Sequence, residues 1–195
     1  MPLQAMLFDL DGTLTQPLLD FPAIKREIGI SEDAFILEAL EGMTSPERRR
    51  AMEIVERHEL EASKACRFND GAGELLAELS RRELRVGIIT RNSRRSLRIV
   101  TERLGIRYDV GVCRDHAAPK PSPEGLEVAL RQMTVAPGSA VYVGDHRIDI
   151  EAGRTAGTRT IWVTNGRPQS PRPDADFEVR SPGEIIGLLD TLAAN

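Results

Sequence analysis

Short apolar runs rich in β-branched residues recur along the chain, separated by stretches with helical periodicity. Runs of this length without strict polar alternation are typical of strands buried on both faces. The expected strands cover residues 5–10, 84–90, 109–113, 140–145 and 159–164. Helical patterns precede the second strand and lie between the later ones. This alternation predicts an α/β fold with a doubly wound, Rossmann-like parallel sheet.

The chain departs from that alternation between residues 16 and 68, where helical patterns over 20–29, 31–43 and 45–65 follow one another with no strand between them. This segment leaves the expected sheet directly after its first strand and returns near Asn69. We therefore expect a small inserted α-helical cap at residues 16–68 and a core domain formed by residues 1–15 and 69–195. Long insertions between elements are usually functional, which favours a lid over the site. After the fifth strand, residues 166–176 are expected to form a Pro-rich surface loop before a short strand and a closing helix.

Composition and charge narrow the range of partners. A chain of 195 residues with 41% apolar content can bury a sizeable core, and 26 basic against 30 acidic residues leave a net charge of −4. The chain has no surplus of basic residues that would indicate a nucleic-acid-binding protein. It also has no apolar stretch near the length that spans a bilayer, so a membrane protein is not expected. Two cysteines outside any metal-ligand spacing, and no secretory leader, indicate a cytoplasmic protein.

Polar residues gather where the expected strands end. In open parallel sheets the ligand lies beyond the carboxyl ends of the strands, so these residues should share one edge. A single Asp-Gly pair, threonine or lysine has an ordinary structural explanation as a turn, cap or surface charge, but their joint placement does not. They are Asp9 and Asp11 after the first strand, Thr90, Arg91 and Asn92 at the second, Lys120 after the third, and Asp145 and Asp149 at the fourth.

Several carboxylates brought together need a compensating cation. Oxygen ligands favour Mg²⁺, a hard ion that normally also binds water and phosphate oxygens. The three histidines are scattered, so no zinc site is expected. An EF-hand loop starting at Asp9 fails because its sixth position is Leu14 rather than glycine.

With DLDGT after the first strand, Thr90 after the second, Lys120 in a KPSP context and then GDHRID, the chain resembles the haloacid dehalogenase superfamily. The likeness spans the whole chain and is to the phosphoglycolate-phosphatase-like branch, whose helical cap is inserted after the first motif. The resemblance implies an Mg²⁺-dependent phosphomonoester hydrolase. The presence of Asp11 favours phosphate hydrolysis over dehalogenation. A halide ion leaves without a proton, and the dehalogenases of the family lack an aspartate at this position.

The resemblance also implies a role for each residue. Asp9 would be the nucleophile, forming an aspartyl-phosphate, and Asp11 the general acid and then the base. Asp9 and Asp145 would bind Mg²⁺ through side chains and Asp11 through its backbone carbonyl. Lys120 would offset negative charge, and Asp149 would orient Lys120 or support the metal indirectly. Phosphoryl oxygens would be held by Thr90, Arg91, Asn92 and Lys120.

The expected partner is a small phosphorylated metabolite, with a compound similar to phosphoglycolate as one candidate, bound by a monomer or homodimer. Two alternatives stay open: a phosphosugar mutase, which shares all these motifs, and a non-catalytic binding or regulatory module. Arg48, Arg49 and Arg50 are candidates to contact the leaving group, although a solvated helix face explains such a run more simply. His116 and His146 are candidates for the pocket rim.

Overall fold

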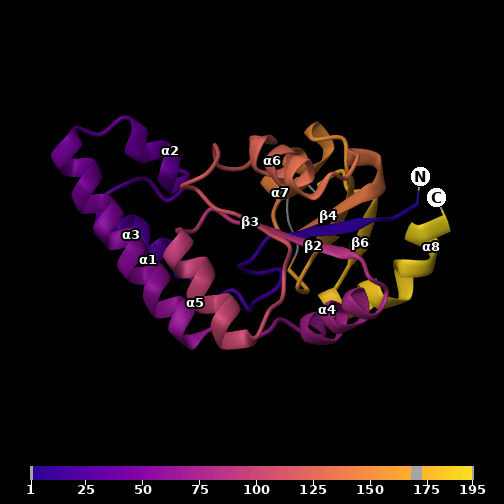
Figure 1. Cartoon of the computed structure of the whole chain (residues 1–195). Helices are drawn as coiled ribbons and strands as arrows, with labels where there is room; N and C mark the ends of the chain where they lie inside the picture. Colours follow the sequence, from indigo (N-terminus) through magenta and orange to yellow (C-terminus); the bar gives the residue numbers. More distant parts are fainter. Residues whose placement is uncertain (1, 168–172, 195) are drawn as a thin grey trace.

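A computed structural model describes residues 2–167 and 173–194 and contains a parallel sheet of six strands in the order β3-β2-β1-β4-β5-β6 (Figure 1). All five strand pairs are parallel. The strands are β1 (Ala5–Phe8), β2 (Arg85–Ile89), β3 (Val110–Val112), β4 (Ala140–Gly144), β5 (Arg159–Val163) and β6 (Phe177–Val179). The expected doubly wound sheet is therefore confirmed, with the sequence order reversing beside β1.

Helices cover both faces of this sheet, which explains why the strands are apolar without alternation. In β1, Met6 and Phe8 pack with one face and Leu7 with the other, because successive side chains of a strand point to opposite sides. The first face is covered by α4 (Ala72–Arg81), α5 (Arg94–Leu104), the 3₁₀ helix η2 (Pro182–Leu188) and α8 (Leu189–Ala194). The second is covered by α6 (Glu124–Met133) and α7 (Arg147–Thr155) (Figure 1).

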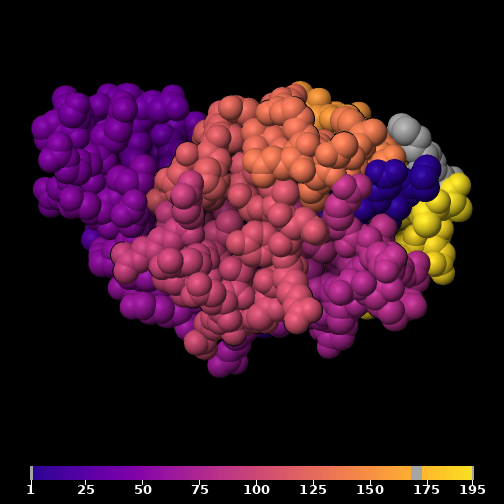
Figure 2. Space-filling view, in the orientation of Figure 1, coloured from indigo at the N-terminus to yellow at the C-terminus, as the bar shows by residue number. Residues whose placement is uncertain are grey.

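The expected helical insertion is present between β1 and α4. It consists of α1 (Phe21–Ile28), α2 (Ile36–Glu41) and the long α3 (Ser45–Ala65). These helices form a lobe at one end of the molecule (Figures 1 and 2), and α3 runs alongside α5 (Figure 1). The chain returns to the core where Thr15 pairs with Phe68 in an isolated antiparallel bridge.

Two boundaries differ from the expectation. The first strand ends at Phe8, so Asp9 and Asp11 lie on the loop that follows, although Asp9 N still donates to Val143 O at 2.9 Å. The second helix of the insertion begins only at Ile36, because the Ser31 hydroxyl accepts from Asp33 N and stabilises a turn there. Part of the expected Pro-rich loop, residues 168–172, lies outside the described residues.

Candidate active site

Lys120 is the positive centre of a buried cluster at the carboxyl edge of the sheet. Its Nζ lies 2.5 Å from Asp9 Oδ1 and 2.6 Å from Asp149 Oδ1. It also donates to Ile89 O at 3.2 Å and to Tyr142 Oη at 3.0 Å, and the tyrosine in turn donates to Asp149 Oδ1. These contacts hold the ammonium group between the ends of β1, β2 and β4. Asp149 therefore contacts Lys120 directly, as one of its two expected roles requires.

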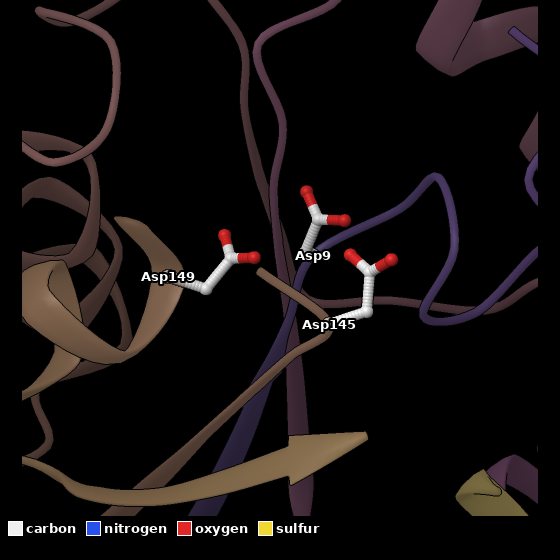
Figure 3. A group of neighbouring side chains, drawn as sticks. All are labelled: Asp9, Asp145 and Asp149. Carbon is white, nitrogen blue, oxygen red and sulfur yellow. The ribbon is translucent and has the colours of Figure 1, made fainter. Parts of the chain in front are cut away.

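Three carboxylates converge at this edge. Three carboxylate oxygens, one from each of Asp9, Asp145 and Asp149, lie within 4.8 Å of one another. Figure 3 shows these side chains turned toward a common space, with Asp9 between the other two. Asp9 and Asp149 are buried, and Asp145 is half-buried. The sheet order brings them together, because β4 pairs directly with β1. The donor set consists of carboxylate oxygens, which suit a hard divalent cation.

The electrostatics of the cluster indicate an excess of negative charge. Burial raises the pKa of Asp9 to about 7, with Lys120 lowering it and Asp149 raising it. Burial also raises the pKa of Asp145 well above its ordinary value, and the charge of Asp9 adds to this rise. For Lys120, burial lowers the pKa, but Asp149 and Asp9 outweigh it and raise the pKa well above the ordinary value. One ammonium thus compensates the three carboxylates only in part, which fits a site for a divalent cation.

The turn at Gly12, directly after Asp11, is fixed by its backbone conformation and by hydrogen bonds to its carbonyl. Gly12 has φ +85°, a left-handed conformation that favours glycine, and an added Cβ would lie 2.2 Å from Asp145 Oδ2. The Gly12 carbonyl accepts from the amides of Asn69, at 3.1 Å, and Asn165, at 2.7 Å. These two side chains clamp the turn from the end of the insertion and from the end of β5.

Asp11 accepts a hydrogen bond at Oδ2 from Asn92 Nδ2. Burial raises the pKa of Asp11 to about 6, and the bond from Asn92 lowers it. Thr90 Oγ1 accepts from Asn92 N at 3.1 Å, so both residues are fixed at the end of β2. Arg91 donates to Lys120 O and pairs with Glu38 of α2 at 2.6 Å. A carboxyl with a pKa near 6 beside a cavity is suited to exchange a proton near neutral pH.

A cavity of about 730 Å³ lies above this cluster between the sheet edge and the insertion. Its walls include every residue that the sequence singled out at the strand ends: Asp9, Asp11, Thr90, Arg91, Asn92, Lys120, Asp145 and Asp149. The insertion contributes Ile24, Phe35, Val55 and Glu59. The Phe35 ring lies 5.6 Å from the Arg91 guanidinium, and its edge meets the His146 ring. The cavity therefore has a polar floor and a partly apolar wall.

Glu59 of α3 joins the insertion to the core beside this cavity. Its carboxylate pairs with Arg114 and accepts from Ser93 N and Ser93 Oγ at 3.2 and 3.1 Å. The side chains of Glu59 and Arg114 are only 5% and 8% exposed, so the pair is removed from water. Burial raises the pKa of Glu59, and Arg114 lowers it.

Other sequence candidates lie elsewhere. Arg48 donates to Leu40 O and Glu41 O at the end of α2, and none of Arg48, Arg49 and Arg50 lines the cavity. His116 contacts Arg94 and does not line it, whereas His146 does. Two clamping residues were missed: Asn165, which the strand-end rule applied to β5 would have found, and Asn69, whose position was noted only as the return point of the insertion. Tyr142 within β4 and Glu59 within a charged helix carry no such signal.

Several known proteins are similar to this chain over most of its length. The model of the family described as haloacid dehalogenase-like hydrolase matches residues 22–163. The N-acetylmuramic acid 6-phosphate phosphatase of Pseudomonas putida is 31% identical over 98% of this chain and 98% of its own. The phosphoglycolate phosphatase of Synechococcus elongatus is 26% identical, covering 97% of this chain and 99% of its own.

Among solved structures, a hydrolase from Pseudomonas syringae superimposes with a TM-score of 0.82 at 22% identity, covering 98% of this chain and all of that one. This likeness concerns the fold. Within the described residues, no helix combines the length and apolar character needed to cross a membrane.

Proposed function

The chain belongs to the haloacid dehalogenase-like hydrolase family and is a phosphatase of it, and we propose that it hydrolyses a small phosphomonoester through an aspartyl-phosphate on Asp9, with Mg²⁺ bound. The observation that carries this proposal is the 2.5 Å contact between Asp9 Oδ1 and Lys120 Nζ on the floor of the cavity. A carboxylate that attacks an anionic phosphoryl group needs a fixed cation to offset the repulsion.

In the first step, an Asp9 oxygen forms a bond to phosphorus while the bond from phosphorus to the ester oxygen breaks. Asp11 donates its proton to the departing oxygen. In the second step, Asp11 takes a proton from water as the water oxygen attacks phosphorus, which releases phosphate and restores the Asp9 carboxylate. Two successive displacements replace one difficult displacement.

Mg²⁺ fits the donor set, since Asp9 and Asp145 offer carboxylate oxygens in a cluster whose negative charge Lys120 compensates only in part. The Asp11 carbonyl is the third protein ligand in this proposal. When bound, Mg²⁺ would neutralise charge on the phosphoryl oxygens. Thr90, Arg91 and Lys120 hold those oxygens from the ends of the neighbouring strands. Asn92, which was expected among them, instead donates to Asp11, and Asp149 keeps Lys120 in place.

Residues 16–68 act as a cap over the core formed by residues 1–15 and 69–195, and the cap recognises the leaving group. Support comes from Ile24, Phe35 and Val55, which line the cavity from the insertion. A volume of about 730 Å³ exceeds what a two-carbon ester fills, which favours a leaving group of sugar size. N-acetylmuramic acid 6-phosphate, on which the Pseudomonas putida relative is named to act, is therefore the first substrate to test.

The test measures phosphate released by the purified protein from that compound, phosphoglycolate, other sugar phosphates and p-nitrophenyl phosphate. We expect turnover that EDTA abolishes, Mg²⁺ restores and Asp9→Asn removes. Asp190→Asn is the matched control, because that carboxylate is 88% exposed near the C-terminus. Activity that persists in Asp9→Asn or in EDTA would contradict the proposal, and an isomerised sugar phosphate in place of free phosphate would identify a mutase.

A further inference from the structure

A buried chain of hydrogen bonds connects the insertion to Asp11. It starts at Ser63 in the last turn of α3, passes to Ser96 in the first turn of α5 at 2.6 Å between the two Oγ atoms, and continues from Ser96 to Asn92 at 3.4 Å. Asn92 then donates to Asp11. Ser63, Ser96 and Asn92 are between 2% and 7% exposed, so water does not compete strongly for these groups.

The direction of every proton in this chain follows from its first member, Ser63. Ser63 Oγ lies 2.6 Å from the Glu59 carbonyl, which can only accept, so the single Ser63 proton points to that carbonyl. Ser96 must therefore donate to Ser63, and its oxygen is left to accept from Asn92. The Asn92 amide consequently presents Nδ2, with one hydrogen toward Ser96 and the other toward Asp11.

This order prevents the Asn92 amide from flipping. A flipped amide would place Oδ1 against Ser96 Oγ, whose proton is already directed to Ser63, so two acceptors would face each other in a buried site. Because Asn92 Nδ2 can only donate to Asp11 Oδ2, the proton of the acid form of Asp11 is confined to Oδ1. Without the two serines, a protonated Asp11 could instead donate to a flipped Asn92 and lose the proton that the leaving group needs.

We infer that Ser63 and Ser96 are positioning residues, which act through Asn92 to keep the acidic proton of Asp11 on Oδ1 for transfer to the leaving group. This inference rests on the proposed function. It also makes α3 of the insertion a part of the acid's support, as well as a wall of the cavity.

Two esters of similar shape separate positioning of the acid from a general structural role. Phenyl phosphate has a basic leaving group that needs a proton, whereas p-nitrophenolate leaves readily as an anion. The value of kcat/KM is the suitable readout, because it includes only the steps up to departure of the leaving group. In Ser63→Ala and Ser96→Ala we expect kcat/KM to fall about tenfold for phenyl phosphate and to stay within about twofold for p-nitrophenyl phosphate, since general-acid catalysis contributes about 10²–10⁴-fold in total.

The double variant Ser63→Ala/Ser96→Ala should lose no more than the larger single loss, because both serines act through one chain. Thr101→Val is the matched control: its buried hydroxyl on α5 donates to Leu97 O and Arg98 O and has no link to Asn92. We expect it to change the two substrates equally.

Equal losses for both esters, no loss for either, or additive losses in the double variant would overturn the inference while the wild-type protein remains active. A wild-type protein that releases no phosphate from any ester would overturn the proposed function and the inference with it. Circular dichroism of each variant establishes that the fold is retained before the kinetics are compared.

Discussion

Replacing Arg114 by alanine leaves the Glu59 carboxylate buried without its guanidinium partner. The pair joins α3 of the insertion to the loop after β3, and its side chains are 5% and 8% exposed. Ser93 would still donate to Glu59 through its N–H and hydroxyl, so the carboxylate keeps two of its hydrogen bonds. The perturbation therefore tests how strongly a desolvated ion pair fixes the insertion to the core.

Breaking a buried pair by removing one partner costs about 3–5 kcal/mol, and the remaining bonds from Ser93 place this case near the lower end, about 3 kcal/mol. For a chain of this size, each kcal/mol lowers the melting temperature by about 2–4 °C, which predicts a decrease of about 6–12 °C. Arg81→Ala is the control. Arg81 contacts Glu78 at 2.6 Å but is 69% exposed, so water screens the pair and its loss should lower the melting temperature far less.

The penalty should also depend on pH. Burial already raises the pKa of Glu59, and Arg114 is the main group that lowers it, so Arg114→Ala raises this pKa further. A neutral Glu59 avoids the cost of a buried charge, so the loss of stability should be smaller at pH 5 than at pH 8. Thermal unfolding followed by circular dichroism at both pH values measures this. A decrease no larger than that of Arg81→Ala, or one independent of pH, would refute the reasoning.

Three further predictions concern the site. Gly12→Ala should lower kcat about 100-fold in the phosphate-release assay, because the new Cβ displaces the Asp145 carboxylate. Gly105→Ala is the control: Gly105 also has a positive φ, +66°, but no atom lies within 4 Å of the added Cβ, so this variant should keep full activity. Lys120→Met should lower kcat about 10²–10³-fold with the fold retained by circular dichroism, and a fully active variant would argue against a role in charge compensation. In EDTA the melting temperature should fall as the pH rises from 5 to 8. The pKa of Asp9 is about 7 in the folded protein, against an ordinary value of 3.8. The folded protein therefore binds more protons than the unfolded chain in this pH range, and raising the pH favours unfolding. Mg²⁺ should then stabilise the protein more at pH 8 than at pH 5, and an equal effect at both would count against the metal site.

The sheet and its ligand edge could be predicted from the sequence because most strands are short apolar runs, and polar residues follow β1, β2 and β4 directly. Asp9, Lys120 and Asp145 converge as a direct consequence of parallel topology. The insertion could also be predicted from periodicity and turn signals, whereas the order of the six strands depends on which strands pair and was not predicted. The later start of the second inserted helix was missed, because the hydrogen bond at Ser31 competes locally with a helical pattern.

The polar contacts between the insertion and the core could not be predicted. Glu59 stands in a helix rich in charged residues, where a buried glutamate and a solvated one look alike. Ser63 and Ser96 are 33 positions apart and meet only because α3 packs along α5, and the choice of partner helix depends on tertiary packing. The core topology follows from local pattern, whereas the support of Asp11 depends on how two amphipathic helices meet.

The most direct test of the central claim is to look for the phosphoryl group on Asp9. The Asp11→Asn variant should still accept a phosphoryl group from p-nitrophenyl phosphate on Asp9. It should hydrolyse this aspartyl-phosphate slowly, because it lacks the base of the second step. Acid quenching, digestion and mass spectrometry should then find one phosphoryl group on the peptide that contains Asp9. If the wild-type protein turns over and the variant carries no phosphoryl group there, or carries it on another residue, the mechanism is wrong.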